Sequence, residues 1–373
     1  MQRRLSDYSS GRDNNFNLIR LIAASMVLVS HSFTLATGRP DLEPFSREIG
    51  ITFGSMAVDI FFVTSGFLVT GSLISRKNIL EFFLARALRI YPGLWVSQVV
   101  TVVIVGLWFS SLSSKLFFTE WTTWHSFLKN CVLIRGVDAS FPGAFETVPF
   151  KQGGANSSLW TLPVELGMYI KLGISWLVLG LVRRYGGRLF VAFCVGVAAL
   201  STLLDLFDYI NPSWDFLPLA SGWTLTSKFF TGATLRLLQS RVVASRWVAG
   251  FMMLVLVASI MNLFCFGIAY KLVLPYLVIY VALVPSLGRF RFLTKGDYSY
   301  GIYIYAYPIQ QSIATVIKNI PPFKMFVLAY PITFLFAFAS WHLVEKHSLK
   351  FKEHLGRSIP AIFRTPAPRV KAQ

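Results

Sequence analysis

Charged residues are scarce in this sequence, and their scarcity excludes an ordinary soluble domain. They make up 14% of the 373 residues, against about 25% in a typical soluble protein. Hydrophobic residues make up 54% of the chain. We therefore expect an integral membrane protein, in contact with the lipid bilayer over much of its surface.

Cysteine is almost absent as well. Cys131, Cys194 and Cys265 lie far apart and form neither a CxxC pair nor a Cys/His cluster. Such spacing indicates neither a disulfide framework nor a metal site, so no metal is expected. We predict that the three thiols serve as small apolar residues inside the protein.

Apolar runs of about 20 residues dominate the remaining sequence, and each is long enough to cross about 30 Å of hydrocarbon. Ten such runs lie at approximately 18–37, 55–74, 90–108, 159–182, 189–207, 217–238, 247–264, 266–286, 298–317 and 323–344. They predict an all-α, polytopic membrane protein with a bundle of about ten transmembrane helices. We divide the chain into an N-terminal tail (1–13), a transmembrane domain (14–352) and a C-terminal tail (353–373) that we expect to be disordered.

Acidic residues are also few, 17 against 35 Lys and Arg. If the N-terminus is cytoplasmic, ten spans place most of the basic residues in cytoplasmic loops and the C-terminal tail, as the positive-inside rule requires. We therefore predict that both termini are cytoplasmic. Orientation in the bilayer and contact with anionic lipid or an anionic cofactor explain the basic charge, so we expect no nucleic-acid partner.

The first apolar run, within "NNFNLIRLIAASMVLVSHSFTLATG" at 14–38, carries Arg20 at its start and His31 deep inside. Eleven helical steps bring His31 back to within about 20° of Arg20 and about 16 Å further along the axis. Both side chains therefore share one face at two depths. A titratable imidazole at membrane depth usually faces a bundle interior or a wet cavity, so this pair indicates a path into the membrane.

Other polar side chains occur inside the predicted spans. Asp59 and Ser65 lie in the second run, and Glu165 lies near the exterior end of the fourth. A charge at the bilayer centre costs about 2.5 to 3.5 kcal/mol, so a carboxylate there needs a reason. One explanation is that Glu165 or Asp59 pairs with Lys171 or Lys228 and stabilises the packing of the helices. The other is that the carboxylate takes part directly in catalysis.

Two arginines stand three residues apart in "RKNILEFFLARALRIYPG", at 76–93. Arg86 and Arg89 share one face of a predicted interfacial helix whose other positions are apolar. Two guanidiniums in this arrangement can clamp phosphate oxygens, although basic residues at this point can also act only as topology determinants.

Several motifs together resemble a known family. They are Arg20-x10-His31, "DIFFVTSGFL", Arg86-x-x-Arg89 followed by "RIYP", "SSLWTLPVE", "DYSYGIYIYAYPI" and "SWHLVEKHSLKFK". In this order they resemble the acyltransferase type 3 family of bacterial membrane O-acyltransferases over about 14–352. The resemblance implies transfer of an acyl group, usually acetyl from cytoplasmic acetyl-CoA, to a hydroxyl of an extracytoplasmic glycan such as lipopolysaccharide O-antigen or exopolysaccharide. It also implies a multi-pass protein of the bacterial cytoplasmic (inner) membrane.

Matching the family's motifs residue by residue gives candidate catalytic residues. His31 corresponds to the catalytic histidine and Arg20 to its partner, and Glu165 corresponds to the glutamate of the Trp-Ser-Leu-x-x-Glu pattern. We add Asp59, since either carboxylate could orient the imidazole. Ala306 is a departure, because the family often has a histidine at that place.

The same resemblance gives candidate cofactor-binding residues. Arg86 and Arg89 correspond to the arginines that are expected to hold CoA phosphates, and we add Ser65 and Tyr91, which lie in the matched motifs. An extended pantetheine arm is long enough to bring a thioester from these arginines toward His31.

Alternatives remain open at this stage. His31 could act as a general base on the sugar hydroxyl or carry the acyl group itself. A proton-coupled transporter of a small anionic or sugar-like solute would also need polar residues in a helical bundle, and a nonenzymatic scaffold for polysaccharide assembly is a third class.

Overall fold

The computed structural model describes residues 3–9, 14–76, 78–151, 154–182, 185–211, 220–284 and 296–351. Within these ranges all regular secondary structure is helical, apart from two isolated bridges that join Arg4 to Val243 and Ser110 to Ala144. The prediction of an all-α protein is therefore confirmed. The C-terminal tail predicted at 353–373 lies outside the described residues.

Each of the ten apolar runs contains a long helix in its described part. The helices are α1 (Ser6–Ser9), α2 (Phe16–Thr37), α3 (Ser46–Ile49), α4 (Phe53–Ser75), α5 (Ile79–Ile104), α6 (Ser114–Thr119), α7 (Trp121–Val132), α8 (Thr161–Gly180), α9 (Gly186–Ile210), α10 (Ala220–Leu237), α11 (Arg246–Ser259), α12 (Leu263–Leu283), α13 (Ser299–Val316) and α14 (Pro322–Ser340). A 3₁₀ turn at Ser157–Trp160 precedes α8, and π-helical turns at Val105–Phe109 and Trp341–Glu345 follow α5 and α14.

Seven of the described helical segments are long and apolar enough to cross a membrane. They are Phe16–Thr37, Phe53–Ser75, Ile79–Phe109, Ser157–Gly180, Gly186–Ile210, Leu263–Leu283 and Pro322–Phe351. The predicted count of about ten is thus not confirmed, and the cytoplasmic position of the two termini stays a prediction. The protein is a multi-pass membrane protein by this criterion.

Helix α13 shows why hydropathy undercounts the bundle. Its sequence contains four tyrosines and two glutamines, yet the residues from Ser299 to Pro308 are all buried. Helices α2, α5 and α14 pack against it. Because the other helices cover α13, its polar side chains meet protein and not lipid.

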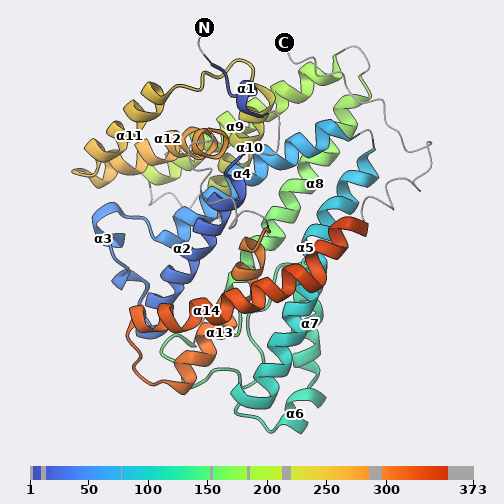
Figure 1. Ribbon diagram of the computed structural model, residues 1–373, viewed down its shortest axis with the longest axis vertical. Helices are drawn as coiled ribbons and strands as arrows, with labels where there is room; N and C mark the ends of the chain where they lie inside the picture. Colours follow the sequence, from blue (N-terminus) through green and yellow to red (C-terminus); the bar gives the residue numbers. More distant parts are fainter. Residues whose placement is uncertain are drawn as a thin grey trace.

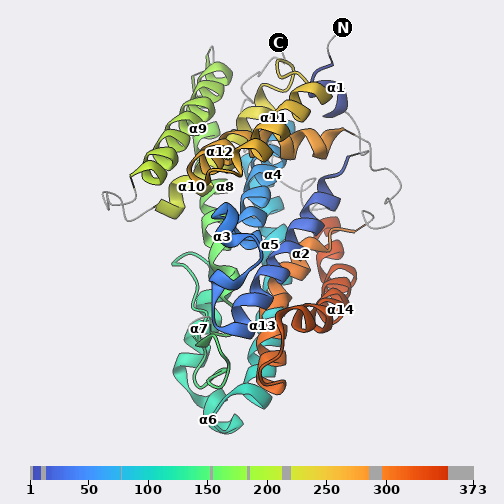
Figure 2. The same ribbon diagram turned by 90° about the vertical axis from the view of Figure 1, so that its left-hand side faces the viewer.

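The helices pack into one elongated bundle (Figures 1 and 2). Helix α4 packs against α2 and α10, α10 packs against α9, and α14 packs against α2 and α13. In both views α6 and α7 lie at the end of the bundle opposite α1 and α11. The central helices α2, α4, α8 and α13 therefore surround the interior in which the candidate site lies.

Small residues set the closest helix contact, between α4 and α10. A side-chain carbon added at Gly66 would overlap the main-chain oxygen of Phe229, and one added at Gly232 would overlap that of Val63. The two backbones touch because neither glycine has a side chain, as small residues permit between membrane helices.

Helix α5 differs from its prediction. An interfacial helix was expected before a separate span at 90–108, but Ile79–Ile104 is a single helix that contains Arg86, Arg89 and Pro92. Its arginines are not exposed at the surface: Arg89 pairs with two carboxylates and Arg86 lies over an aromatic ring. Since two carboxylates neutralise Arg89 and an aromatic ring covers Arg86, the helix does not need to end where the arginines occur.

Candidate functional site

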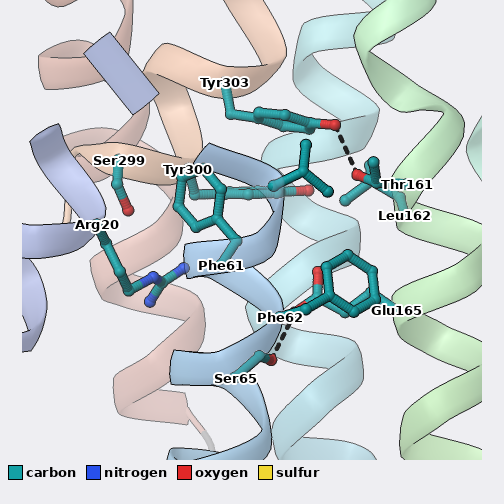
Figure 3. A pocket seen from close by; sticks show the side chains of 11 residues that line it. Arg20, Phe61, Phe62, Ser65, Thr161, Leu162, Glu165, Ser299, Tyr300 and Tyr303 are labelled. Atoms are coloured by element: carbon teal, nitrogen blue, oxygen red, sulfur yellow. Dashed lines mark hydrogen bonds between the residues drawn. The ribbon is translucent and has the colours of Figure 1, made fainter. Parts of the chain in front are cut away.

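A cavity of about 50 Å³ lies where α2, α4, α8 and α13 meet. Three of the residues singled out from the sequence, Arg20, Ser65 and Glu165, line it. The other lining residues are Val58, Phe61, Phe62, Thr161, Leu162, Ser299, Tyr300 and Tyr303. Figure 3 shows Arg20 entering from one side, with Ser65 and Glu165 below and Tyr303 and Thr161 above. The cavity thus joins polar groups from four helices inside an apolar wall.

Glu165 is held by two hydroxyl groups. Ser65 Oγ on α4 donates to Glu165 Oε1 over 2.8 Å, and the phenol of Tyr169, one turn further along α8, donates to the same oxygen. Tyr169 in turn carries Arg86 above its ring, with 5.9 Å between the guanidinium carbon and the ring centroid. A chain of contacts therefore runs from Arg86 to the cavity wall at Glu165.

Arg20 and Arg89 share one carboxylate. Asp297 Oδ2 lies 2.7 Å from Arg20 Nη1 and 2.5 Å from Arg89 Nη2. Arg89 Nη1 lies 3.2 Å from Glu345 Oε2, and Ser299 Oγ donates to Asp297 Oδ1 over 2.5 Å. Although burial opposes ionisation, the two guanidiniums lower the pKa of Asp297 to about 2. Two arginines and two carboxylates thus form a charge-balanced network beside the cavity.

Sequence reasoning did not single out either carboxylate. Asp297 begins the motif "DYSYGIYIYAYPI", and Glu345 lies in "SWHLVEKHSLKFK". Both motifs carry the family resemblance, but nothing in their spacing identifies these acids as partners of the arginines. The usable signal was that buried guanidiniums require counter-charges, and that Asp297 and Glu345 lie directly at the ends of the predicted spans 298–317 and 323–344.

The two arginines predicted to bind phosphate differ in their partners. Arg89 is paired with Asp297 and Glu345, and its side chain is 13% exposed. Arg86 makes no ion pair within the described part of the chain, and its Nε has no hydrogen-bond partner there. Of the pair, only Arg86 therefore carries a positive charge that is not already neutralised by a carboxylate.

His31 lies beyond the cavity, toward the C-terminal end of α2. Its ring meets that of Tyr307 edge-on, with 5.0 Å between centroids and an interplanar angle of 81°. Tyr307 lies four residues after Tyr303, which lines the cavity, so one turn of α13 (about 6 Å) separates the two positions. His31 Nδ1 has no hydrogen-bond partner among the described residues. Ala306, where the family often has histidine, is 1% exposed.

Asp59 lies in a different polar cluster. Its carboxylate accepts a hydrogen bond of 2.9 Å from the phenol of Tyr270 on α12. Lys228 on α10 lies 5.4 Å from the centroid of the same ring, and Lys271 forms an ion pair of 2.7 Å with Asp205. Asp59 does not line the cavity, so the structure does not bring it together with Glu165.

Two more candidates also lie apart from the cavity. The phenol of Tyr91 donates to the main-chain oxygen of Val132 at the end of α7, over 3.1 Å. Lys171 is exposed on α8, so it does not pair with Glu165. Within the described ranges no group of three or more His, Cys, Asp or Glu residues is placed to hold a metal ion.

Comparisons with known proteins give a consistent picture. A family model described as an acyltransferase domain matches residues 13–342. An O-acetyl transferase of Shigella phage Sf6 is 29% identical over 91% of this chain and 96% of its own. Nodulation protein 10 of Rhizobium leguminosarum bv. viciae is 28% identical over 94% and 97% of the two chains, respectively. Acyltransferase MdmB of Streptomyces mycarofaciens is 26% identical over 40% of this chain and 34% of its own. No solved structure matches the chain.

Proposed function

This chain belongs to the acyltransferase type 3 family, and from that premise we propose that it moves an acetyl group from cytoplasmic acetyl-CoA to a hydroxyl of an extracytoplasmic glycan. The family match makes it an acyltransferase of the membrane. The name of the phage relative, an O-acetyl transferase that aligns along nearly the whole chain, supports acetyl as the group and oxygen as its acceptor. The bacterial inner membrane is the proposed location, because acetyl-CoA is then supplied on one side and the glycan on the other.

The position of the cavity is the observation that carries this proposal. Glu165 in its wall is joined to Arg86 through Tyr169. Tyr303, also in the wall, lies one turn of α13 before Tyr307, which contacts His31. The cavity thus lies between a cation without a counter-charge and an imidazole with an unpartnered nitrogen. A pantetheine arm that enters past Arg86 would follow this line.

At the donor end, Arg86 fits the diphosphate of acetyl-CoA better than Arg89 does. Its Nε is buried without a hydrogen-bond partner, and a phosphate oxygen would satisfy it as a charge-assisted acceptor. Acetyl-CoA, when bound, supplies an acetyl group activated as a thioester. Arg89, already paired with Asp297 and Glu345, holds α5 against α13 and α14 in this account.

At the acceptor end, His31 acts as the general base. The neutral imidazole takes the proton of the sugar hydroxyl as its oxygen attacks the acetyl carbonyl carbon. The new ester C–O bond forms while the C–S bond breaks, and the proton passes from His31 to the departing thiolate. Such a base contributes about 10² to 10⁴ in rate.

Glu165 supports the reaction from the cavity wall. Because it accepts hydrogen bonds from Ser65 and Tyr169, it fixes the position of both hydroxyls beside the path of the donor. The transporter alternative has no comparable support, since the family and two of the three aligned relatives are acyltransferases by description or name.

Purified protein in detergent tests the donor site through acetyl-CoA binding by calorimetry. We expect Arg86→Met to weaken binding at least tenfold, because one charge-assisted hydrogen bond contributes about 1.5 to 3 kcal/mol. Arg188→Met, on α9 outside the cavity, is the matched control and should bind as wild type does. If Arg86→Met binds acetyl-CoA with unchanged affinity, the donor site lies elsewhere.

A further inference from the structure

We propose that Asn156, Ser158, Gln310 and Gln311 form, with His31, a binding site for the hydroxyl groups of a sugar ring. The inference rests on the proposed function and goes further, because it assigns an acceptor subsite to residues to which neither the motifs nor the comparisons give a role. All four side chains belong to residues that are at most 2% exposed. Each carries a polar atom without a hydrogen-bond partner in the described part of the chain.

Hydrogen bonds fix the orientation of the three amides. Asn156 Nδ2 donates to the main-chain oxygen of Ile304 over 2.9 Å, and Gln311 Nε2 donates to that of Gly154 over 2.8 Å. Gln310 Nε2 donates to the main-chain oxygen of Leu28 over 2.9 Å. Because a main-chain oxygen can only accept, the nitrogen of each amide must face it. The amide oxygen therefore points elsewhere, and in all three residues it is the unpartnered atom.

These residues gather around the contact between His31 and Tyr307. Ile304, Tyr307 and Gln311 recur at three- and four-residue spacing, so they share one face of α13. Asn156 and Gly154 lie against that face through the hydrogen bonds just described.

The neighbouring face of α13 reaches α2 on either side of His31. Gln310 Nε2 also donates to Ser32 Oγ over 2.7 Å, and its other acceptor, Leu28, lies one turn before the histidine. Tyr303, one turn before Tyr307, donates to the main-chain oxygen of Ser158. The unpartnered atoms thus come from three segments that pack together along α13, next to the Tyr307 ring that contacts His31.

The chemistry of these atoms selects the ligand. The three amide oxygens can only accept, and His31 Nδ1 accepts in the imidazole tautomer that carries its proton on Nε2, which is the tautomer that a general base at Nδ1 requires. The hydroxyl of Ser158 can accept as well as donate. A ligand that satisfies them must donate several hydrogen bonds at close spacing. Phosphodiester and carboxylate groups only accept, so they do not fit, whereas neighbouring hydroxyl groups on a sugar ring do.

Buried polar atoms without partners are uncommon in native proteins, and each calls for an explanation. Here several occur on residues packed around the part of α13 that carries Tyr307, whose ring contacts His31. The same imidazole needs a hydroxyl within reach if it is to act as a base. A sugar that donates to Gln311, Asn156 and His31 would place one of its hydroxyls on the base and fix which hydroxyl that is. The site therefore determines the position of acetylation on the ring.

The segment that precedes α8 offers an entry from the exterior side. Ala155 N donates to the main-chain oxygen of Ala139 over 2.6 Å, and Gly38, which ends α2, lies against Pro149. The segment at 109–157, which ten spans with a cytoplasmic N-terminus place on the exterior side, thus lies against the end of α2 that carries His31. His31 itself is only partly buried. An acceptor would arrive between this segment and α2, on the side of His31 away from Arg20.

Ser158→Ala is the cleanest test, since Ser158 Oγ makes no hydrogen bond within the described protein and its removal breaks none. With a methyl hexopyranoside as soluble acceptor, we expect the KM for the sugar to rise about 3- to 10-fold, because the variant loses one hydrogen bond to the sugar. The KM for acetyl-CoA should not change. Gln311→Met should raise the sugar KM at least as much, and a thermal melt checks its folding.

Thr70→Val is the matched control. Thr70 is also fully buried with an unpartnered hydroxyl, but it lies near the far end of α4 from the exterior segment. We expect both KM values of this variant to equal those of wild type. A sugar KM that is unchanged in Ser158→Ala and Gln311→Met, or a rise in the acetyl-CoA KM instead, would overturn the assignment while leaving the transferase activity in place.

A binding measurement separates the inference from the proposed function. Saturation-transfer NMR without acetyl-CoA reports contact between the protein and the methyl hexopyranoside. We expect transfer to the ring protons in wild type and a weaker signal in Gln311→Met. Binding without any acetyl transfer would count against the proposed function alone. Wild-type protein that shows no sugar binding would overturn the hydroxyl site.

Discussion

Replacing Asp297 by asparagine removes one charge from the network beside the cavity and leaves two guanidiniums without their shared partner. The bonds to Arg20 and Arg89 are 2.7 and 2.5 Å long. Breaking a buried ion pair by removing one partner costs about 3 to 5 kcal/mol. Side-chain exposures of 12% for Asp297, 13% for Arg89 and 22% for Arg20 favour the lower end, so we expect a loss of about 3 kcal/mol.

The thermal melt of detergent-purified protein measures this loss. Scaling from soluble domains, about 3 kcal/mol corresponds to a fall of about 5 °C or more in melting temperature. Glu345→Gln should cost less, because Arg89 then keeps Asp297 and Arg20 is untouched. A double-mutant cycle of Asp297→Asn with Arg20→Met should give a coupling energy of about 1 kcal/mol or more.

The same pairing has a pH signature. The pKa of Asp297 is lowered to about 2, whereas an unfolded aspartate titrates near about 3.9. Its contribution to stability is therefore fully present above pH about 4 and is lost as the pH falls through 2. If Asp297→Asn melts at the wild-type temperature at pH 7, or shows no coupling to Arg20, the network does not hold the site together.

Three further substitutions probe other parts of the account. Gly66→Ala should destabilise the protein by at least about 2 kcal/mol in a thermal melt, because the new carbon overlaps the main-chain oxygen of Phe229. Gly196→Ala is the control, since Gly196 has open space around it and its substitution should not destabilise the protein. Equal melting temperatures of the two variants would refute the close helix contact. Ser65→Ala removes one hydroxyl from Glu165 and should lower kcat/KM for acetyl-CoA about tenfold; an unchanged value would remove Glu165 from the donor path. Burial raises the pKa of Glu43, so the folded protein disfavours the ionised carboxylate. The melting temperature of wild type should therefore fall relative to that of Glu43→Gln as the pH rises from about 4 to 7. A difference in melting temperature that stays constant over this pH range would contradict the burial of Glu43.

Much of the fold follows from the sequence because apolar length is a strong signal. All ten apolar runs became helices in their described parts. Helix α13 shows the limit of that signal, because its tyrosines and glutamines lower its hydropathy although the helix is buried. The helices packed around α13 allow this burial, since they cover its polar side chains. The break predicted between Arg89 and the following span was wrong for a related reason, since Asp297 and Glu345 neutralise that arginine inside the bundle.

The site was predictable where its residues share a helix. Glu165 and Tyr169 are four residues apart on α8, and their contact follows from helical spacing. Ser65 meets Glu165 from a helix 100 residues earlier, and Arg89 meets Asp297 across 208 residues. Helical spacing within one sequence does not specify such long-range partners. Asp59 lies beside Tyr270 and not beside Glu165, and this too is a long-range contact that helical spacing does not specify.

Acetyl transfer across sealed vesicles tests the central claim most directly. Inside-out membrane vesicles expose the cytoplasmic face, so labelled acetyl-CoA can be added outside while the glycan faces the lumen. We predict that label appears on the lumenal glycan with wild-type protein and is lost by at least about 100-fold with His31→Ala, while acetyl-CoA binding is retained. Equal labelling by His31→Ala, or no labelling of the glycan by wild type, would contradict the account.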